Sequence, residues 1–139
     1  MKKFEFPEPG VDDKFLAYGE TLAEAFGNCA LGLFAIISKD RVALKKTKNF
    51  SVRAGNKEKL LYEFLEKLLS LVDTENFLVG IVKKISITQK EDLYFLQVEV
   101  EGDSAEGYEW YMRVRRITSK HCFIKESLHL CIIQVGVEM

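Results

Sequence analysis

The sequence has little net charge, few cysteines and no long apolar run, and each shortage excludes a class of protein. Its 20 Lys and Arg residues nearly cancel its 21 Asp and Glu residues. No overall field therefore draws in nucleic acid or an anionic membrane, although a local patch is compatible with this balance. No apolar stretch approaches the roughly 20 residues of a membrane span. The first residues, MKKFE, lack the apolar core of a secretion signal. Three cysteines are too few, and odd in number, for a secreted disulfide framework. We expect a cytoplasmic protein that does not associate with a membrane.

Sequence motifs of independent catalysis are also missing. The chain shows no Ser-His-Asp order, no glycine-rich phosphate loop and no HExxH pattern. Its two histidines, His121 and His129, stand without a nearby nucleophile pattern. We therefore do not expect the protein to be an enzyme.

What is present is typical of one globular domain spanning residues 1–139. A chain of this length buries about two-thirds of its unfolded surface, enough for a core without disulfides or structural metals. Hydrophobic residues make up 47% of the chain and charged residues 29%, which are ordinary proportions.

The first half of the chain predicts one strand and two helices. Residues 14–19 alternate with a strand-like period. Thr21 and Glu24 then form a capping-box pattern, and apolar residues at helical spacing follow as far as Ser38. Residues 42–54 favour extended chain, and Gly55-Asn56 interrupts it. The next helix carries an unbroken apolar stripe and is followed by a predicted loop at 73–76. The stripe comprises Leu60, Leu61, Phe64, Leu65, Leu68, Leu69 and Val72.

The second half is predicted to be mostly strand. Apolar and β-branched runs at 77–88 and 93–101 flank a polar turn at 89–92, and a loop is expected at 102–107. A long strand is predicted at 109–117, and residues 123–125 and 128–137 favour a closing hairpin. The fold class is therefore α+β, with two helices on one face of a largely antiparallel or mixed sheet.

The order of these motifs resembles the archease family, the small partner proteins of RtcB-type RNA ligases. The most specific matches are AYGETLAEAFGNCALGLF at 17–34 and LLYEFLEKLLSLVDTENFL at 60–78. Two family motifs differ here. The family's His-Thr-Ala-Asp reads Pro9-Gly10-Val11-Asp12, and its Thr-x-His reads Thr118-Ser119-Lys120, with His121 displaced by one position.

The resemblance implies a non-enzymatic accessory protein that activates an RNA ligase. It would promote the guanylylation and turnover of an RtcB-type ligase in tRNA splicing or RNA repair. It also implies a site for a divalent cation, Ca²⁺ or Mn²⁺/Mg²⁺, with Asp12 and Glu138 as ligands and Asp40 as a third. Carboxylates from separate chain segments suit such hard cations. The alternative is that Asp12 and Asp13 are solvated turn residues after Pro9-Gly10.

A second hypothesis is a binding module on the same fold that holds a protein or RNA without a metal. In residues 110–115, Arg113 and Arg115 alternate with apolar residues. Guanidinium groups on one strand face suit RNA phosphates or a protein partner. The alternative for this stripe is a solvated sheet face balanced by nearby glutamates.

The cysteines leave one further alternative open. If Glu126-Ser127 forms a two-residue turn, Cys122 faces Cys131 across a hairpin, close to disulfide or zinc geometry. Against this, Glu-Ser is a poor residue pair for such a turn, and a cytosol keeps thiols reduced. Buried cysteine is also common as a small apolar residue.

Overall fold

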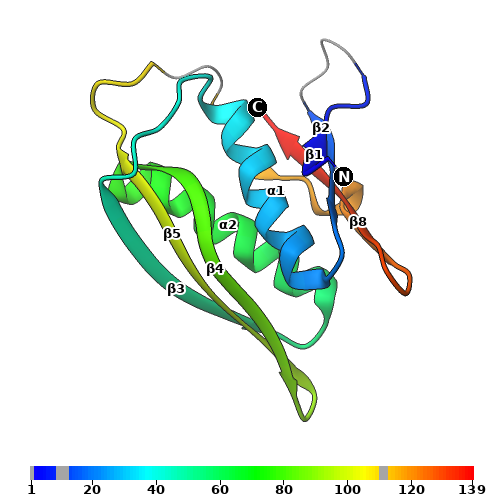
Figure 1. Cartoon of the computed structure of the whole chain (residues 1–139). Coiled ribbons are helices and arrows are strands. Elements are labelled where there is room, and N and C mark those ends of the chain that lie inside the picture. The colour runs from blue at the N-terminus through cyan, green and yellow to red at the C-terminus, as the bar shows by residue number, and fades with distance from the viewer. Residues whose placement is uncertain (1, 9–12, 110–112) are drawn as a thin grey trace.

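A computed structural model describes residues 2–8, 13–109 and 113–139 of the chain (Figure 1). It contains two α-helices, a single 3₁₀ turn and strands that pair antiparallel. The elements in chain order are β1 (Phe4–Glu5), β2 (Lys14–Gly19), α1 (Leu22–Ile37), β3 (Lys46–Ala54), α2 (Lys57–Glu75), β4 (Phe77–Lys90), β5 (Leu93–Ser104), β6 (Arg116–Ile117), η1 (Ser119–His121), β7 (Phe123–Glu126) and β8 (Cys131–Glu138). The predicted α+β class is confirmed.

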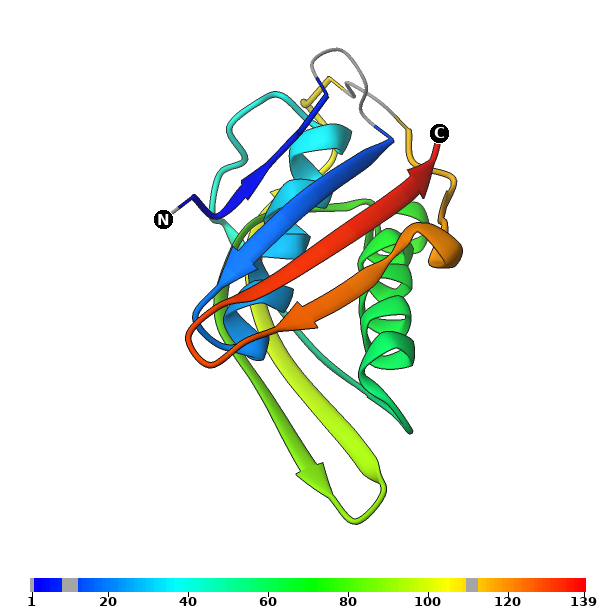
Figure 2. The same cartoon turned by 90° about the vertical axis from the view of Figure 1, so that its right-hand side faces the viewer.

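The strands form two sheets, where the sequence predicted one. The first runs in the order β1-β2-β8-β6, with β7 also paired to β8, and the second runs β3-β5-β4. Both helices contact strands of both sheets, so they form a layer between them. Figure 2 shows the first sheet in front of the helices and the second behind them.

Helix α1 lies between the sheets because most of its surface is apolar. Glu24 is the one charged residue among its 16 positions, and the partly exposed Asn28, Leu31 and Ala35 share its face. The other faces are apolar and are stable only when buried. Its ends follow the predicted signals. The Thr21 hydroxyl accepts from the Glu24 N–H at 3.1 Å, and the Glu24 carboxylate accepts from the Glu20 N–H at 3.2 Å. Ser38 is the C-cap.

Helix α2 is amphipathic, as predicted, but longer. Its apolar stripe is buried against α1 and the sheets, and the Asn56 side chain caps its start by accepting from the Lys59 N–H at 2.8 Å. The predicted loop at 73–76 is wrong, because the helix continues to Glu75. Asn76 ends it in the left-handed conformation, with φ 53°, which asparagine tolerates better than most residues.

The sheet β3-β5-β4 contains a long hairpin that projects beyond the helices (Figure 1). Strands β4 and β5 extend past the predicted limits, to Lys90 and Ser104, so the turn at their tip is shorter than predicted. Of the predicted extended segment 42–54, only Lys46–Ala54 is a strand.

In the other sheet, β8 lies between β2 on one side and β6 and β7 on the other. The predicted strand at 109–117 is wrong for residues 113–115, and residues 110–112 lie outside the described residues. Only Arg116 and Ile117 pair, with Glu138 and Val137. Strand β8 ends at Glu138, so residues 113–115 do not continue the pairing as a strand.

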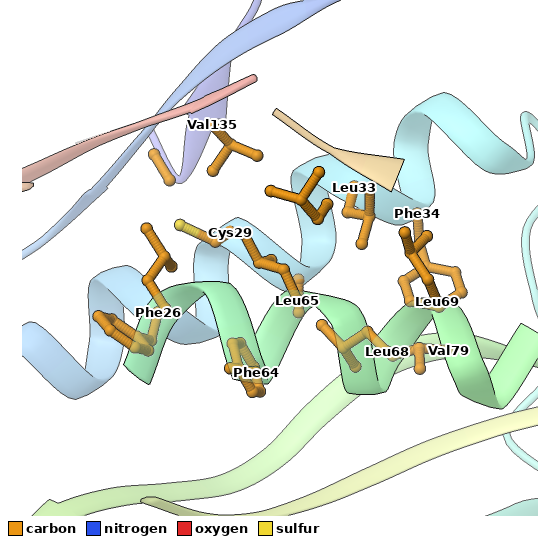
Figure 3. Packing of buried hydrophobic residues seen from close by; sticks show 14 of the residues in the cluster. Phe26, Cys29, Leu33, Phe34, Phe64, Leu65, Leu68, Leu69, Val79 and Val135 are labelled. Atoms are coloured by element: carbon orange, nitrogen blue, oxygen red, sulfur yellow. The ribbon is translucent and has the colours of Figure 1, made fainter. Parts of the chain in front are cut away.

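The core joins side chains of both helices to strands from either sheet. Figure 3 shows Phe26, Cys29 and Leu33 of α1 beside Phe64, Leu65 and Leu68 of α2, with Val135 of β8 and Val79 of β4 nearby. On the other side of α1, the ring of Phe15 is fully buried and lies directly over Gly32. No helix within the described residues is both long and apolar enough to cross a membrane.

The contact between Phe15 and Gly32 predicts a strong effect of a single methyl group. A Cβ atom at Gly32 would lie 2.3 Å from Cε2 of Phe15. We expect Gly32→Ala to lower the free energy of unfolding by about 1–3 kcal/mol, as overpacking does, measured by urea denaturation.

Gly27→Ala is the matched control in the same helix. A Cβ atom there would meet Val82 and Ile85 at an ordinary 3.6 Å. We expect it to be neutral or to stabilise by up to about 1 kcal/mol, since alanine is a better helix former. Equal losses in the two variants would contradict the packing argument.

Candidate functional site

Glu138, a predicted metal ligand, lies at the end of β8 and already has a cationic partner. Its Oε2 is 3.2 Å from Nε of Arg116, and its side chain is 44% exposed. Its backbone carbonyl accepts from the Arg115 N–H at 2.7 Å. The carboxylate is therefore held on one side by a guanidinium group and open to solvent on the other.

Asp40, the predicted third ligand, lies in the loop that follows α1. Its Oδ2 accepts a hydrogen bond from the Glu109 N–H at 3.3 Å, and its own N–H donates to the Ser38 hydroxyl at 3.2 Å. Asp40 thus connects the loop after α1 to the segment that follows β5.

Tyr108 reinforces the same connection and was missed by the sequence analysis. Its hydroxyl accepts from the Ala43 N–H at 3.0 Å and donates to the Asp103 carboxylate at 2.8 Å. The bond from Tyr108 is the main reason that the pKa of Asp103 is lowered. No local sequence signal joins Tyr108 to Ala43, because they are far apart in the chain.

Asp12, the first predicted ligand, lies outside the described residues. The next residue, Asp13, is exposed. The backbone carbonyl of Asp13 accepts a hydrogen bond from the Val137 N–H at 2.8 Å. The start of β2 therefore lies beside the end of β8. Both figures place these two ends near the end of α1, on one side of the molecule.

The described part of this end does not by itself form a metal centre. Within residues 2–8, 13–109 and 113–139, no group of three or more His, Cys, Asp or Glu side chains is placed to hold a metal ion. The donor chemistry fits a hard cation, since Glu138 and Asp40 both offer carboxylate oxygens. The prediction of a cation at Asp12, Glu138 and Asp40 is not tested by these residues.

Arg113, Arg115 and Arg116 are all exposed. Arg113 and Arg115 do not lie on a strand, contrary to the prediction, whereas Arg116 belongs to β6. Arg113 Nη2 lies 3.8 Å from the Asp73 carboxylate, and its side chain is 75% exposed. Arg115 is also exposed, while Val114 between them is buried. The ion pair of Arg116 with Glu138 depends on the pairing of β6 with β8, and no local sequence signal predicts it.

The facing arrangement considered for Cys122 and Cys131 is wrong. Cys131 pairs with Glu126, because the hairpin turn is longer than two residues and closes with the Ser127 N–H donating to the Leu130 carbonyl. Cys122 instead lies by Gly136, whose N–H donates to its sulfur at 3.4 Å. All three cysteines are free.

Solved structures of the same architecture place this chain among small α+β proteins with helices between two antiparallel sheets. The solution structure of Methanobacterium thermoautotrophicum protein 1598 matches all of both chains, with a TM-score of 0.82 and 29% identity. The crystal structure of an archease and possible chaperone from Thermotoga maritima covers 97% of each chain, with a TM-score of 0.64 and 11% identity, a likeness of fold alone.

Similarity in sequence to known proteins identifies the family of this chain. The archease protein family (MTH1598/TM1083) matches residues 4–137. Protein archease of Thermococcus kodakarensis is 37% identical over 121 residues, which are 85% of this chain and 84% of that protein. Protein archease of Methanosarcina acetivorans is 29% identical over 141 residues, covering 99% and 97%. The chain belongs to the archease family, as its motifs predicted.

The burial of the cysteines predicts slow thiol chemistry. Burial raises the pKa of Cys131 to about 11, raises that of Cys122, and places that of Cys29 well above its ordinary value. At pH 8 the thiols of the folded protein therefore stay protonated and react slowly with a disulfide-exchange reagent.

We expect all three thiols to react quickly in urea, and the mass of the unreduced protein to show no internal disulfide. Rapid labelling of Cys29 or Cys131 in the folded protein would contradict their burial. A mass lower by two protons before reduction would contradict their free state.

Proposed function

We propose that this chain is an accessory protein that binds an RtcB-type RNA ligase in the cytoplasm and promotes its guanylylation and turnover. The observation that carries the proposal is the family match over residues 4–137, in a chain that keeps the motif aspartate Asp12. In this proposal the ligase performs the covalent chemistry of tRNA splicing or RNA repair. This chain supplies a binding surface and carboxylates.

The proposal assigns a divalent cation, Ca²⁺ or Mn²⁺/Mg²⁺, to Asp12, Glu138 and Asp40. When bound, such a cation would neutralise negative charge on phosphate oxygens. One contact supports the assignment. The Asp13 carbonyl accepts from the N–H of Val137, so the residue after Asp12 lies beside the residue before Glu138.

A second candidate is a binding module without a metal, for which one contact argues directly. The Arg116 guanidinium already compensates the charge of Glu138 at 3.2 Å, so that carboxylate does not require a metal. In this candidate the exposed Arg113 and Arg115 contact an acidic protein or the RNA held by the ligase.

The ligase proposal predicts different results for two neighbouring aspartates. We expect Asp12→Ala to abolish the stimulation of guanylylation, measured as labelled GMP transferred from GTP to an RtcB-type ligase. Asp13→Ala is the matched control and should keep full stimulation, because Asp13 contributes its carbonyl and has an exposed side chain. No stimulation by the wild-type chain, or full stimulation by Asp12→Ala, overturns the mechanism.

The cation assignment predicts that Arg116 competes with the metal for Glu138. We expect Arg116→Ala to bind Ca²⁺ or Mn²⁺ more tightly than the wild-type chain in calorimetry, because a positive charge next to the ligand is removed. Its cost in unfolding free energy should stay within about 1 kcal/mol, since the pair is exposed. Unchanged binding would remove Glu138 from the ligand set, and no binding by either chain would favour the module without a metal.

A further inference from the structure

A narrow apolar groove runs between the start of α2 and the segment from η1 to β7. Its volume is about 250 Å³, below the range of about 300–1,000 Å³ typical of small-molecule sites, so it suits a single bulky side chain. One wall is the first two turns of α2 and the other is residues 119–124. The lining residues are Glu58, Lys59, Leu61, Tyr62, Ser119, Cys122, Phe123 and Ile124.

Phe123 is the most unusual part of this groove. Its ring is 44% exposed, although it belongs to a strand and stands among apolar neighbours. An exposed aromatic ring at a pocket rim is a common anchor of protein interfaces. An ion pair between Lys57 and Glu126 joins the start of α2 to the end of β7.

Strand β7 also offers a free edge beside the groove. Among the described residues it pairs with β8 alone, and Figure 2 shows it as the outer strand of its sheet on the side where α2 passes. Unpaired N–H and C=O groups of such an edge bind an extended peptide, while adjacent pockets hold its alternate side chains.

The charge around the groove favours an acidic partner. Residues 113–125 include five Lys and Arg residues and no Asp or Glu. Lys59, Lys120 and Lys125 make no ion pair within the described part of the chain, and Glu58 is the single carboxylate among the described lining residues. The apolar lining suits a side chain of a protein better than the phosphates of RNA.

We propose that this groove binds an extended segment of a partner protein, in which a bulky apolar side chain is flanked by acidic residues. The segment adds to the free edge of β7, its apolar side chain enters beside Phe123 and Tyr62, and its carboxylates meet Lys59, Lys120 and Lys125. The biological role of this contact rests on the proposed accessory function, in which the groove gives the partner protein a docking surface.

The test uses the full chain and labelled synthetic peptides, without ligase or cation, and reads binding by fluorescence anisotropy. The peptides carry a central Trp, Leu or Ala flanked by Asp and Glu or by Lys. We expect acid-flanked Trp and Leu peptides to bind at least about tenfold more tightly than Ala-centred or Lys-flanked ones. Phe123→Ala should weaken binding roughly tenfold, as the loss of an anchor residue does, whereas Phe123→Tyr should retain it.

Two further variants distinguish binding of the peptide in the groove from nonspecific binding to the surface. Lys59→Glu should reduce the preference for acid-flanked peptides, and it leaves the helix intact because acidic residues suit a helix N-terminus. Leu93→Ala, which removes a side chain of similar exposure (38%) on the β4–β5 hairpin, should change nothing.

Three results would overturn the proposal. They are a lack of preference among the peptides, an equal loss in Leu93→Ala, and tighter binding of a labelled single-stranded RNA that Phe123→Ala abolishes. Peptide binding without ligase stimulation would leave the groove intact and reject the accessory function. The opposite pattern would reject the groove alone.

Discussion

The burial of most of α1 between the two sheets is the constraint on which the rest of the structure depends. A helix satisfies its own backbone hydrogen bonds, so an apolar one can lie between two sheets without polar partners. Small residues on α1 let the layers approach closely. Gly32 accommodates the ring of Phe15 from β2, and Gly27 lies against Val82 and Ile85 of β4 on another side. The two sheets are thus positioned by their contact with one helix. Helix α2 then closes the layer with its single apolar stripe.

The same arrangement explains why acidic residues from distant parts of the chain share one end of the molecule. A short turn at Glu20 and Thr21 joins β2 to α1, so α1 ends near the point where β2 begins. Strand β8 pairs antiparallel with β2 and therefore ends there too. The directions of β2, α1 and β8 are therefore enough to place Asp13, Asp40 and Glu138 at the same end of the molecule. Their local contacts, such as the Arg116–Glu138 pair, then set the chemistry that each carboxylate offers.

The sequence predicted the features that depend on neighbouring residues. The Thr21–Glu24 capping pattern and the stripe from Leu60 to Val72 located both helices, and the motif order identified the family. Features that depend on residues far apart in the chain were not predicted. Residues 113–115 were predicted as strand, yet β8 ends at Glu138, and only the Arg115 N–H bonds to it. The register of Cys131 depends on a turn length that Glu126-Ser127 does not reveal. The near absence of charge in α1 indicated that it contacts both sheets, but a single sheet was predicted. Of the candidate site, Asp40 and Glu138 were chosen by resemblance, whereas their partners Glu109 and Arg116 emerged from the fold.

The pairing of β2 with β8 also determines how the chain must fold. The two strands are more than a hundred residues apart, so their contact closes a very long loop, and such contacts form slowly. Until the β2–β8 contacts form, part of the apolar surface of α1 remains exposed to solvent. During synthesis α1 emerges long before β8, and its uncovered surface is exposed to aggregation in that interval. The helix that organises the native structure is therefore also the segment that most needs protection while the chain is incomplete.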